Sequence, residues 1–214
     1  MNESATRLEE QIISFFQDRE TQICQGWIMK KMGDGLFVYP LYYKYSQGNI
    51  PDNIQKCEET SHQSGLDCVF RIVEHTNYHL SYILTDIGYV IKKCGVVGEW
   101  NITEDAGSIY APRKTQDSLF LKNEGENAEY VMADADTVIG IKRQELLFLP
   151  DGNLQDVSVE DILRFSVDNG VTRILADIPG KEELPEQYGR AGFQRGYLYR
   201  CYQKEEKSSK EQED

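Results

Sequence analysis

The stretch LSYILTDIGY at residues 80–89 returns as LPEQYGRAGF at residues 184–193, at an offset of 104 residues (184 − 80). Three further matches follow in the same order along the chain: GNIPD at 48–52 with GNLQD at 152–156, Gly65 with Gly170, and WIM at 27–29 with YVM at 130–132. Internal repetition at about half of the chain length indicates two copies of one module rather than a solenoid of short repeats.

Both copies show the same predicted order of elements, which is strand, strand, helix, strand, helix, strand. In the first copy these elements fall at residues 27–32, 36–45, 52–64, 67–73, 77–86 and 89–97, after an amphipathic helix at 7–16. In the second copy they fall at 129–133, 138–143 with a further strand at 145–149, then 158–168, 172–178, 181–190 and 193–203. Alternating strands and helices predict an α/β (α+β) fold with mixed sheets flanked by helices.

The repeat sets the expected domain limits. Residues 1–98 form the predicted N-terminal copy, 99–112 the connection, 113–203 the C-terminal copy and 204–214 a disordered polar tail. The two copies are expected to be related by a pseudo-twofold axis. Such an arrangement protects sheet edges that would otherwise be exposed.

Charge and composition exclude several classes of function. The net charge of −13 repels nucleic-acid phosphates and anionic membrane surfaces, so we expect neither as a partner. The first 20 residues lack the apolar core of a signal peptide, and no run is long enough to span a bilayer, which predicts a cytoplasmic protein. Five scattered cysteines without a Cys-x-x-Cys pair predict reduced thiols.

The end of the repeated stretch resembles a known family. Tyr188, Gly192 and Phe193 form a Tyr-x-x-x-Gly-Phe pattern that resembles the carboxyl half of the GNAT acyltransferase superfamily, and the first copy resembles the amino-terminal half of tandem GNAT proteins. The resemblance covers most of the chain. It implies a splayed sheet that binds acetyl-CoA and passes the acetyl group to an amine.

The resemblance also implies site residues in the second copy. Tyr188 would be the general acid on the departing CoA sulfur, because a phenol keeps its proton at neutral pH. The strand carrying Leu147 and Leu149 would hold the acyl oxygen through backbone amides, and Gly152 and Asn153 would lie in the loop that contacts the cofactor. The alternative for Tyr188 is a purely structural ring, since the first copy has Leu84 at the matching position.

One stretch departs from the family pattern. The family's diphosphate loop, Gln/Arg-x-x-Gly-x-Gly/Ala, corresponds here to residues 150–161, which hold one glycine and no arginine or lysine. Asp156, Glu160 and Asp161 would oppose a diphosphate at the start of the helix. Two functions therefore remain open, an N-acyltransferase and a non-catalytic GNAT-like module that binds a small molecule or a protein partner.

Two other groups of residues have a functional and a structural interpretation. His75 and His79 have the spacing of two metal ligands on one helix face, but no third ligand is evident, and we expect no metal site. The tyrosines of the strand at 36–45, together with Tyr197, Tyr199 and Tyr202, form either an amphipathic sheet surface or the wall of a ligand pocket.

Overall fold

The computed structural model describes residues 3–16, 21–42, 48–74, 76–102, 119–123, 129–133, 137–150 and 157–205. The chain forms two compact units. Unit 1 comprises residues 1–7, 16–94 and 199–214, and unit 2 comprises residues 8–15 and 95–198. Two strands are shared between the units. One part of β5 (Tyr89–Asn101) and of β11 (Gln194–Lys204) belongs to unit 1 and the other part to unit 2. The limits expected from the repeat stay a prediction.

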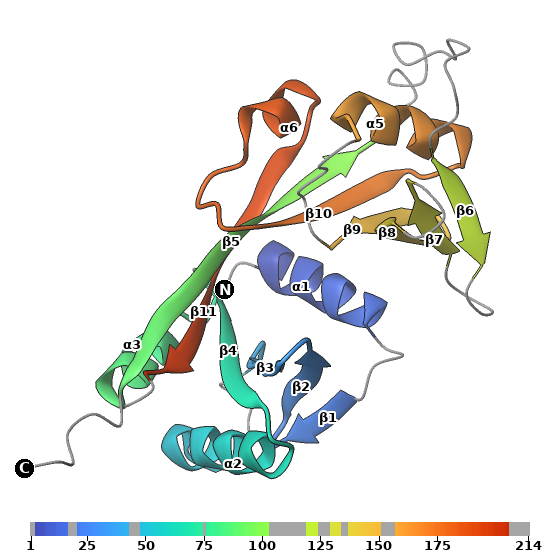
Figure 1. The fold of residues 1–214 in the computed structure, drawn as a ribbon. Helices are drawn as coiled ribbons and strands as arrows, with labels where there is room; N and C mark the ends of the chain where they lie inside the picture. The colour runs from blue at the N-terminus through green and yellow to red at the C-terminus, as the bar shows by residue number, and fades with distance from the viewer. Residues whose placement is uncertain are drawn as a thin grey trace, which may run out of the picture. The chain divides into compact units, whose positions relative to one another are not determined.

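Unit 1 is a sheet covered by two helices (Figure 1). Its elements are β1 (Thr21–Cys24), β2 (Trp27–Met32), β3 (Gly35–Tyr39), α2 (Ile50–Gln63), β4 (Asp67–Val73) and α3 (Tyr78–Asp86). Strands β1, β2 and β3 are antiparallel, β3 and β4 are parallel, and β4 pairs with β11 in antiparallel register. Ile54 of α2 and Leu80 of α3 pack into one core with Phe70 of β4, so both helices cover the same sheet face.

Local sequence explains the boundaries in unit 1. Gly33, at φ +61°, supplies the left-handed residue of the two-residue turn between β2 and β3, as the Gly-Asp-Gly signal predicts. Asn49 begins α2 by accepting a hydrogen bond from the Asp52 amide at 2.8 Å. Gly65, at φ +66°, follows its end.

Unit 2 has helices on both faces of its sheet. Its elements are α1 (Glu3–Phe15, of which 8–15 belong to this unit), β6 (Phe120–Asn123), β7 (Glu129–Met132), β8 (Val138–Arg143), β9 (Leu146–Leu149), α5 (Val159–Asp168), β10 (Arg173–Pro179) and α6 (Glu186–Arg190). Leu147 and Leu149 point into a core with α5 and α6. The residue between them, Phe148, stacks on Phe15 of α1 at 5.1 Å between ring centroids.

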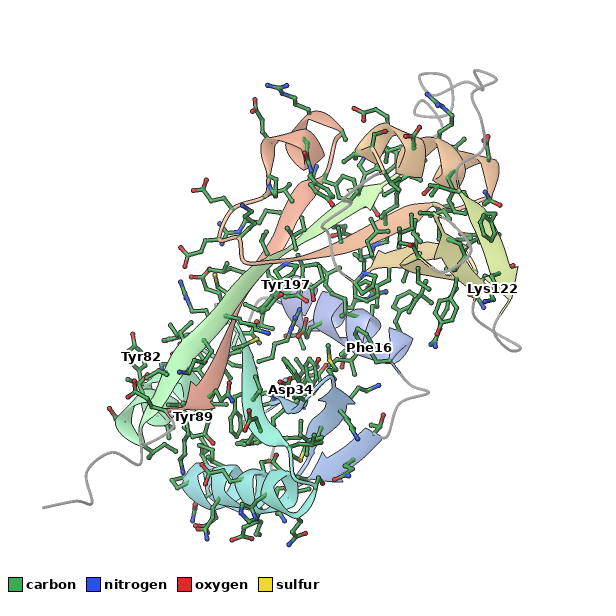
Figure 2. The ribbon with its side chains drawn as sticks, viewed as in Figure 1. Phe16, Asp34, Tyr82, Tyr89, Lys122 and Tyr197 are labelled. Atoms are coloured by element: carbon green, nitrogen blue, oxygen red, sulfur yellow. The ribbon has the colours of Figure 1, made fainter. Side chains whose placement is uncertain are left out.

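Polar contacts fix α1 against this sheet. Arg143 donates to the Ser14 carbonyl at 2.7 Å, and Arg173 donates to the Gln11 side chain at 2.9 Å. Tyr197, labelled in Figure 2, donates to the buried carboxylate of Glu9. Because buried polar groups are costly unless they are paired, these contacts favour a single position of the helix within the unit.

Several predicted elements need correction. The second helix of the C-terminal copy is α6, residues 186–190, rather than 181–190, because Pro185 disfavours a helical conformation in the residue before it. The strand expected at 36–45 ends at Tyr39, before Pro40, which has no N–H to donate. Strand β5 continues to Asn101, into the expected connection.

Other differences are omissions or lie outside the described residues. The short strands β1 and β6 were not predicted from the sequence. The match of residues 27–29 with 130–132 is wrong, because β2 adjoins β3 whereas the strand adjoining β9 is β8 and not β7. The expected tail lies outside the described residues from position 206 onward, although Lys204 ends β11. No helix in the described part of the chain is long and apolar enough to cross a membrane.

Candidate active site

The parallel pairing of strands β9 and β10 in unit 2 ends before β10 does. Strand β9 pairs with β10 from Leu146–Arg173 to Leu149–Ala176 and then stops. Strand β10 continues through Asp177 to Pro179, still paired with β5 on its other side as far as Gly95. Among the described residues, no strand pairs with the β9-facing edge of 177–179.

In unit 1 the parallel pairing of β3 and β4 also ends before β4 does. Strand β3 pairs with β4 from Gly35–Asp67 to Val38–Phe70, and β4 continues to Val73, paired with β11. In both units the strand therefore extends three residues past the end of the parallel register. The first of these residues is buried and charged in each case, Arg71 in unit 1 and Asp177 in unit 2. Arg71 lies over the Tyr199 ring, 3.4 Å from its centroid.

Tyr188 lies in the helix that packs beside the opening of unit 2. Its side chain is 0% exposed and belongs to the same core cluster as Leu149, Ala176 and Ile178. The Tyr188 ring meets the Phe193 ring edge to face, with centroids 5.1 Å apart at 84°. Burial raises the pKa of the Tyr188 phenol to about 12, so the group stays protonated at neutral pH.

Gly192 explains the spacing between Tyr188 and Phe193. The Phe193 amide donates to the Tyr188 carbonyl at 3.0 Å, which turns the chain sharply after α6. Gly192 has φ +100°, and a Cβ there would lie 2.8 Å from Trp100 Nε1. Glycine is thus required both by the backbone conformation and by the close approach of an indole ring.

The start of α5 is satisfied by its own side chains. Ser158 Oγ accepts from the Asp161 amide at 3.1 Å and donates to the Asp161 carboxylate at 2.8 Å. The capping acceptor is therefore the Ser158 hydroxyl and not a carboxylate. Glu160 and Asp161 are in the first turn as expected, and Asp161 also lies 3.6 Å from Arg164.

The predicted cofactor-binding residues fall into two groups. The side chains of Leu147 and Leu149 are 0% and 1% exposed, so only the backbone of their strand could contact a ligand. Gly152, Asn153 and Asp156 lie outside the described residues. The site assignments therefore stay predictions.

The arrangement matches solved structures. The chain superposes on a GCN5-related N-acetyltransferase from Kribbella flavida with a TM-score of 0.57 at 11% identity, covering 96% of this chain and 97% of that chain. The chain has the GNAT fold. A GCN5-related N-acetyltransferase from Sphaerobacter thermophilus gives a TM-score of 0.51 at 9% identity, covering 83% and 76% of the two chains. The sequence matches no protein-family model and no curated protein.

Asp177 is a further candidate that the sequence pattern did not single out, because it is a buried acidic residue just past the end of the β9–β10 pairing. Ligands of open α/β sheets bind beyond the carboxyl ends of the strands where neighbouring strands diverge. Asp177 stands at that point and is 8% exposed. The signal was present in the sequence as a lone acidic residue inside an otherwise apolar strand, ILADI at 174–178.

The other candidate residues are the histidine pair and the tyrosines. His79 lies in the first turn of α3 and its ring meets the Tyr78 ring at 3.8 Å, whereas His75 lies outside the described residues. Groups of three or more potential metal ligands do not occur among the residues that the structure describes. Tyr197 and Tyr199 are buried, and Tyr202 lines a pocket of unit 1. Tyr43 and Tyr45 lie outside the described residues.

Proposed function

We propose that the chain is a cytoplasmic N-acyltransferase that transfers an acetyl group from acetyl-CoA to a small-molecule amine, with its active site in unit 2. The observation that carries the proposal is the parting of β9 and β10 beside a buried, protonated tyrosine on α6. The fold raises the prior for this chemistry but does not fix it.

The described residues fit one part of acetyl-CoA better than the other. The edge of 177–179 with which no described strand pairs is where an extended, amide-bearing arm would lie. At the start of α5, in contrast, Ser158 Oγ already accepts a hydrogen bond from the Asp161 amide. The carboxylates of Glu160 and Asp161 also disfavour a diphosphate there. When bound, acetyl-CoA would supply an activated thioester.

The chain's own residues have distinct parts in this proposal. The backbone at the end of β9, around Leu149, would hold the acyl oxygen, and the loop with Gly152 and Asn153 would contact the cofactor. Tyr188 keeps its proton on the phenol oxygen because burial disfavours the phenolate. The protonated phenol is the form that can donate to a leaving thiolate, and the raised pKa makes it a weaker acid than a free tyrosine.

We further propose that the two units are copies of one ancestral module. Three features beyond the strand order support this. Gly65 and Gly170 follow α2 and α5 with φ +66° in both cases, and Gly88 and Gly192 follow α3 and α6 with φ +90° and +100°. Leu84 of α3 and Tyr188 of α6 lie about one helical turn before these two glycines, and both side chains are fully buried.

The second candidate function is a non-catalytic module of the same fold that binds a small molecule or a protein partner. Complete burial of Tyr188 and the acidic, serine-capped start of α5 favour it. Under this alternative, Tyr188 is a core residue and the cofactor loop has degenerated. Binding of acetyl-CoA separates the two candidates.

Charge reversal at α5 tests where the cofactor lies. At low ionic strength, Glu160→Arg should tighten acetyl-CoA binding roughly threefold to tenfold, because it replaces a repulsive charge at the helix start by an attractive one. Asp168→Arg, at the last residue of the same helix, makes the same change in net charge away from that end and should have a smaller effect. Affinities come from calorimetric titration.

The comparison between the two variants decides the outcome. A larger gain for Glu160→Arg supports a diphosphate near the start of α5. Equal gains would reflect net charge alone, and unchanged or weaker binding in Glu160→Arg would mean that CoA binds elsewhere or not at all.

A further inference from the structure

Unit 1 contains a pocket of about 310 Å³ that the proposed acyl transfer does not use. Its walls come from α3 (Tyr78, Ser81, Tyr82), from the residue after β4 (Glu74) and from β11 (Arg200, Tyr202). All of these residues belong to unit 1. The volume is at the small end of the range of ligand sites, which suits a molecule the size of an amino acid.

Two tyrosines form an apolar corner of this pocket. Tyr78 and Tyr82 stand one helical turn apart on α3, with ring centroids 6.4 Å apart and planes at 83° (Figure 2 labels Tyr82). They are 48% and 65% exposed, among the most exposed large apolar side chains described. Perpendicular aromatic faces of this kind can pack against a third flat ring, and exposed aromatic groups in a hollow mark binding sites.

A pair of opposite charges stands beside this corner. Arg200 Nη1 lies 3.5 Å from Glu74 Oε1, with side chains 33% and 25% exposed. Both side chains line the pocket and are partly exposed, so a ligand there can reach a guanidinium and a carboxylate.

We propose that this pocket binds a small zwitterion of the amino-acid class that carries an aromatic or bulky apolar group. The ammonium of the ligand faces Glu74, its carboxylate faces Arg200, and its apolar group fills the corner of Tyr78 and Tyr82. A ligand with a single charge meets one favourable and one opposing side chain. A zwitterion meets two favourable ones.

Three matched probes test the charge requirement. Phenylalanine, phenethylamine and 3-phenylpropionate share the aromatic ring. Phenylalanine carries both an ammonium and a carboxylate, phenethylamine carries only the ammonium, and 3-phenylpropionate carries only the carboxylate. Titrated into the full chain and followed by NMR, phenylalanine should bind about tenfold more tightly than either other probe, as expected for loss of one charge-assisted contact. Equal affinity of a singly charged probe, or no binding of phenylalanine at millimolar concentration, would overturn the proposal.

Variants at exposed positions locate the site without threatening the fold. Tyr82→Ala should weaken phenylalanine binding about fivefold or more through loss of the ring, whereas Tyr82→Phe should bind within about twofold of the wild type. Tyr42, also exposed at 45% and outside the pocket lining, provides the control, and Tyr42→Ala should bind normally. Equal losses in Tyr82→Ala and Tyr42→Ala would contradict the placement.

The charge variant gives a second, independent readout. Glu74→Gln should erase the preference for phenylalanine over 3-phenylpropionate while leaving the preference over phenethylamine. An unchanged preference in both comparisons would overturn the role of Glu74. Because the site lies within unit 1, acetyl-CoA binding by the same variants tells a failure of this proposal from a failure of the proposed function.

Discussion

Gly192→Ala is expected to lower the free energy of unfolding by about 2–4 kcal/mol. Two costs combine. An alanine at φ +100° is strained, and its Cβ would lie 2.8 Å from Trp100 Nε1 and 3.3 Å from Trp100 Cδ1. Trp100 is itself buried and stacked on Phe193, with ring centroids 6.1 Å apart, and so cannot move away cheaply.

Two other glycines separate these costs. Gly170 has φ +66° and open space where a Cβ would stand, so Gly170→Ala should cost only about 1 kcal/mol, from backbone strain. Gly189 lies within α6 with no atom near its Cβ position, so Gly189→Ala should be neutral or stabilise by up to about 1 kcal/mol. Urea denaturation of all three variants measures the series. Equal losses at 170 and 192 would show that the contact with Trp100 is unimportant.

Tyr188→Phe is expected to reduce acetyl transfer by about 10²-fold or more, because it removes the proposed general acid and leaves the ring in place. Stability should change by no more than about 1 kcal/mol, since the core contacts with Phe193 and its neighbours remain. Release of CoA thiol in the presence of amines measures turnover. Unchanged turnover in this variant would assign Tyr188 a packing role alone.

Tyr197→Phe is the matched control for Tyr188→Phe. It removes a buried hydroxyl in the same unit, one that donates to the Glu9 carboxylate rather than lying beside the opening of the sheet. Its cost should appear in stability, at about 1.5–3 kcal/mol for a hydrogen bond to a charged group, and not in turnover. A parallel loss of turnover in both variants would indicate a general effect on the fold.

Alkaline pH gives Tyr188 a second signature. Burial raises the pKa of its phenol from 10.0 to about 12, so the folded state holds this proton more tightly than the unfolded state. The corresponding stability is fully present below pH 10 and is lost as pH rises toward 12. Tyr188→Phe should therefore lose less stability than the wild type across this range.

The repeated stretch at 184–193 carried most of what the sequence could predict. Gly192 and Phe193 correctly placed the end of a helix and the start of a strand, because a left-handed glycine and a buried ring follow local rules. Pro185 also follows a local rule, although the helix predicted at 181–190 runs through it. Short edge strands such as β1, with the exposed Ile23, have too little burial to leave a pattern.

The opening of the sheet could not be predicted from the sequence. It depends on where the β9–β10 register ends and on which strand pairs with Asp177, and both are long-range properties. Burial of Tyr188 is likewise set by residues distant in sequence, such as Val96 and Ile162. The pocket of unit 1 joins α3 to β11 across more than 100 positions, so its pair of charges was invisible before the fold was known.

The most direct test of acyl transfer is a calorimetric titration of the full chain with acetyl-CoA at low salt. The account predicts saturable binding in the micromolar range that competing CoA abolishes. Absence of heat at millimolar acetyl-CoA would contradict the acyltransferase proposal and leave the non-catalytic module as the function of this fold.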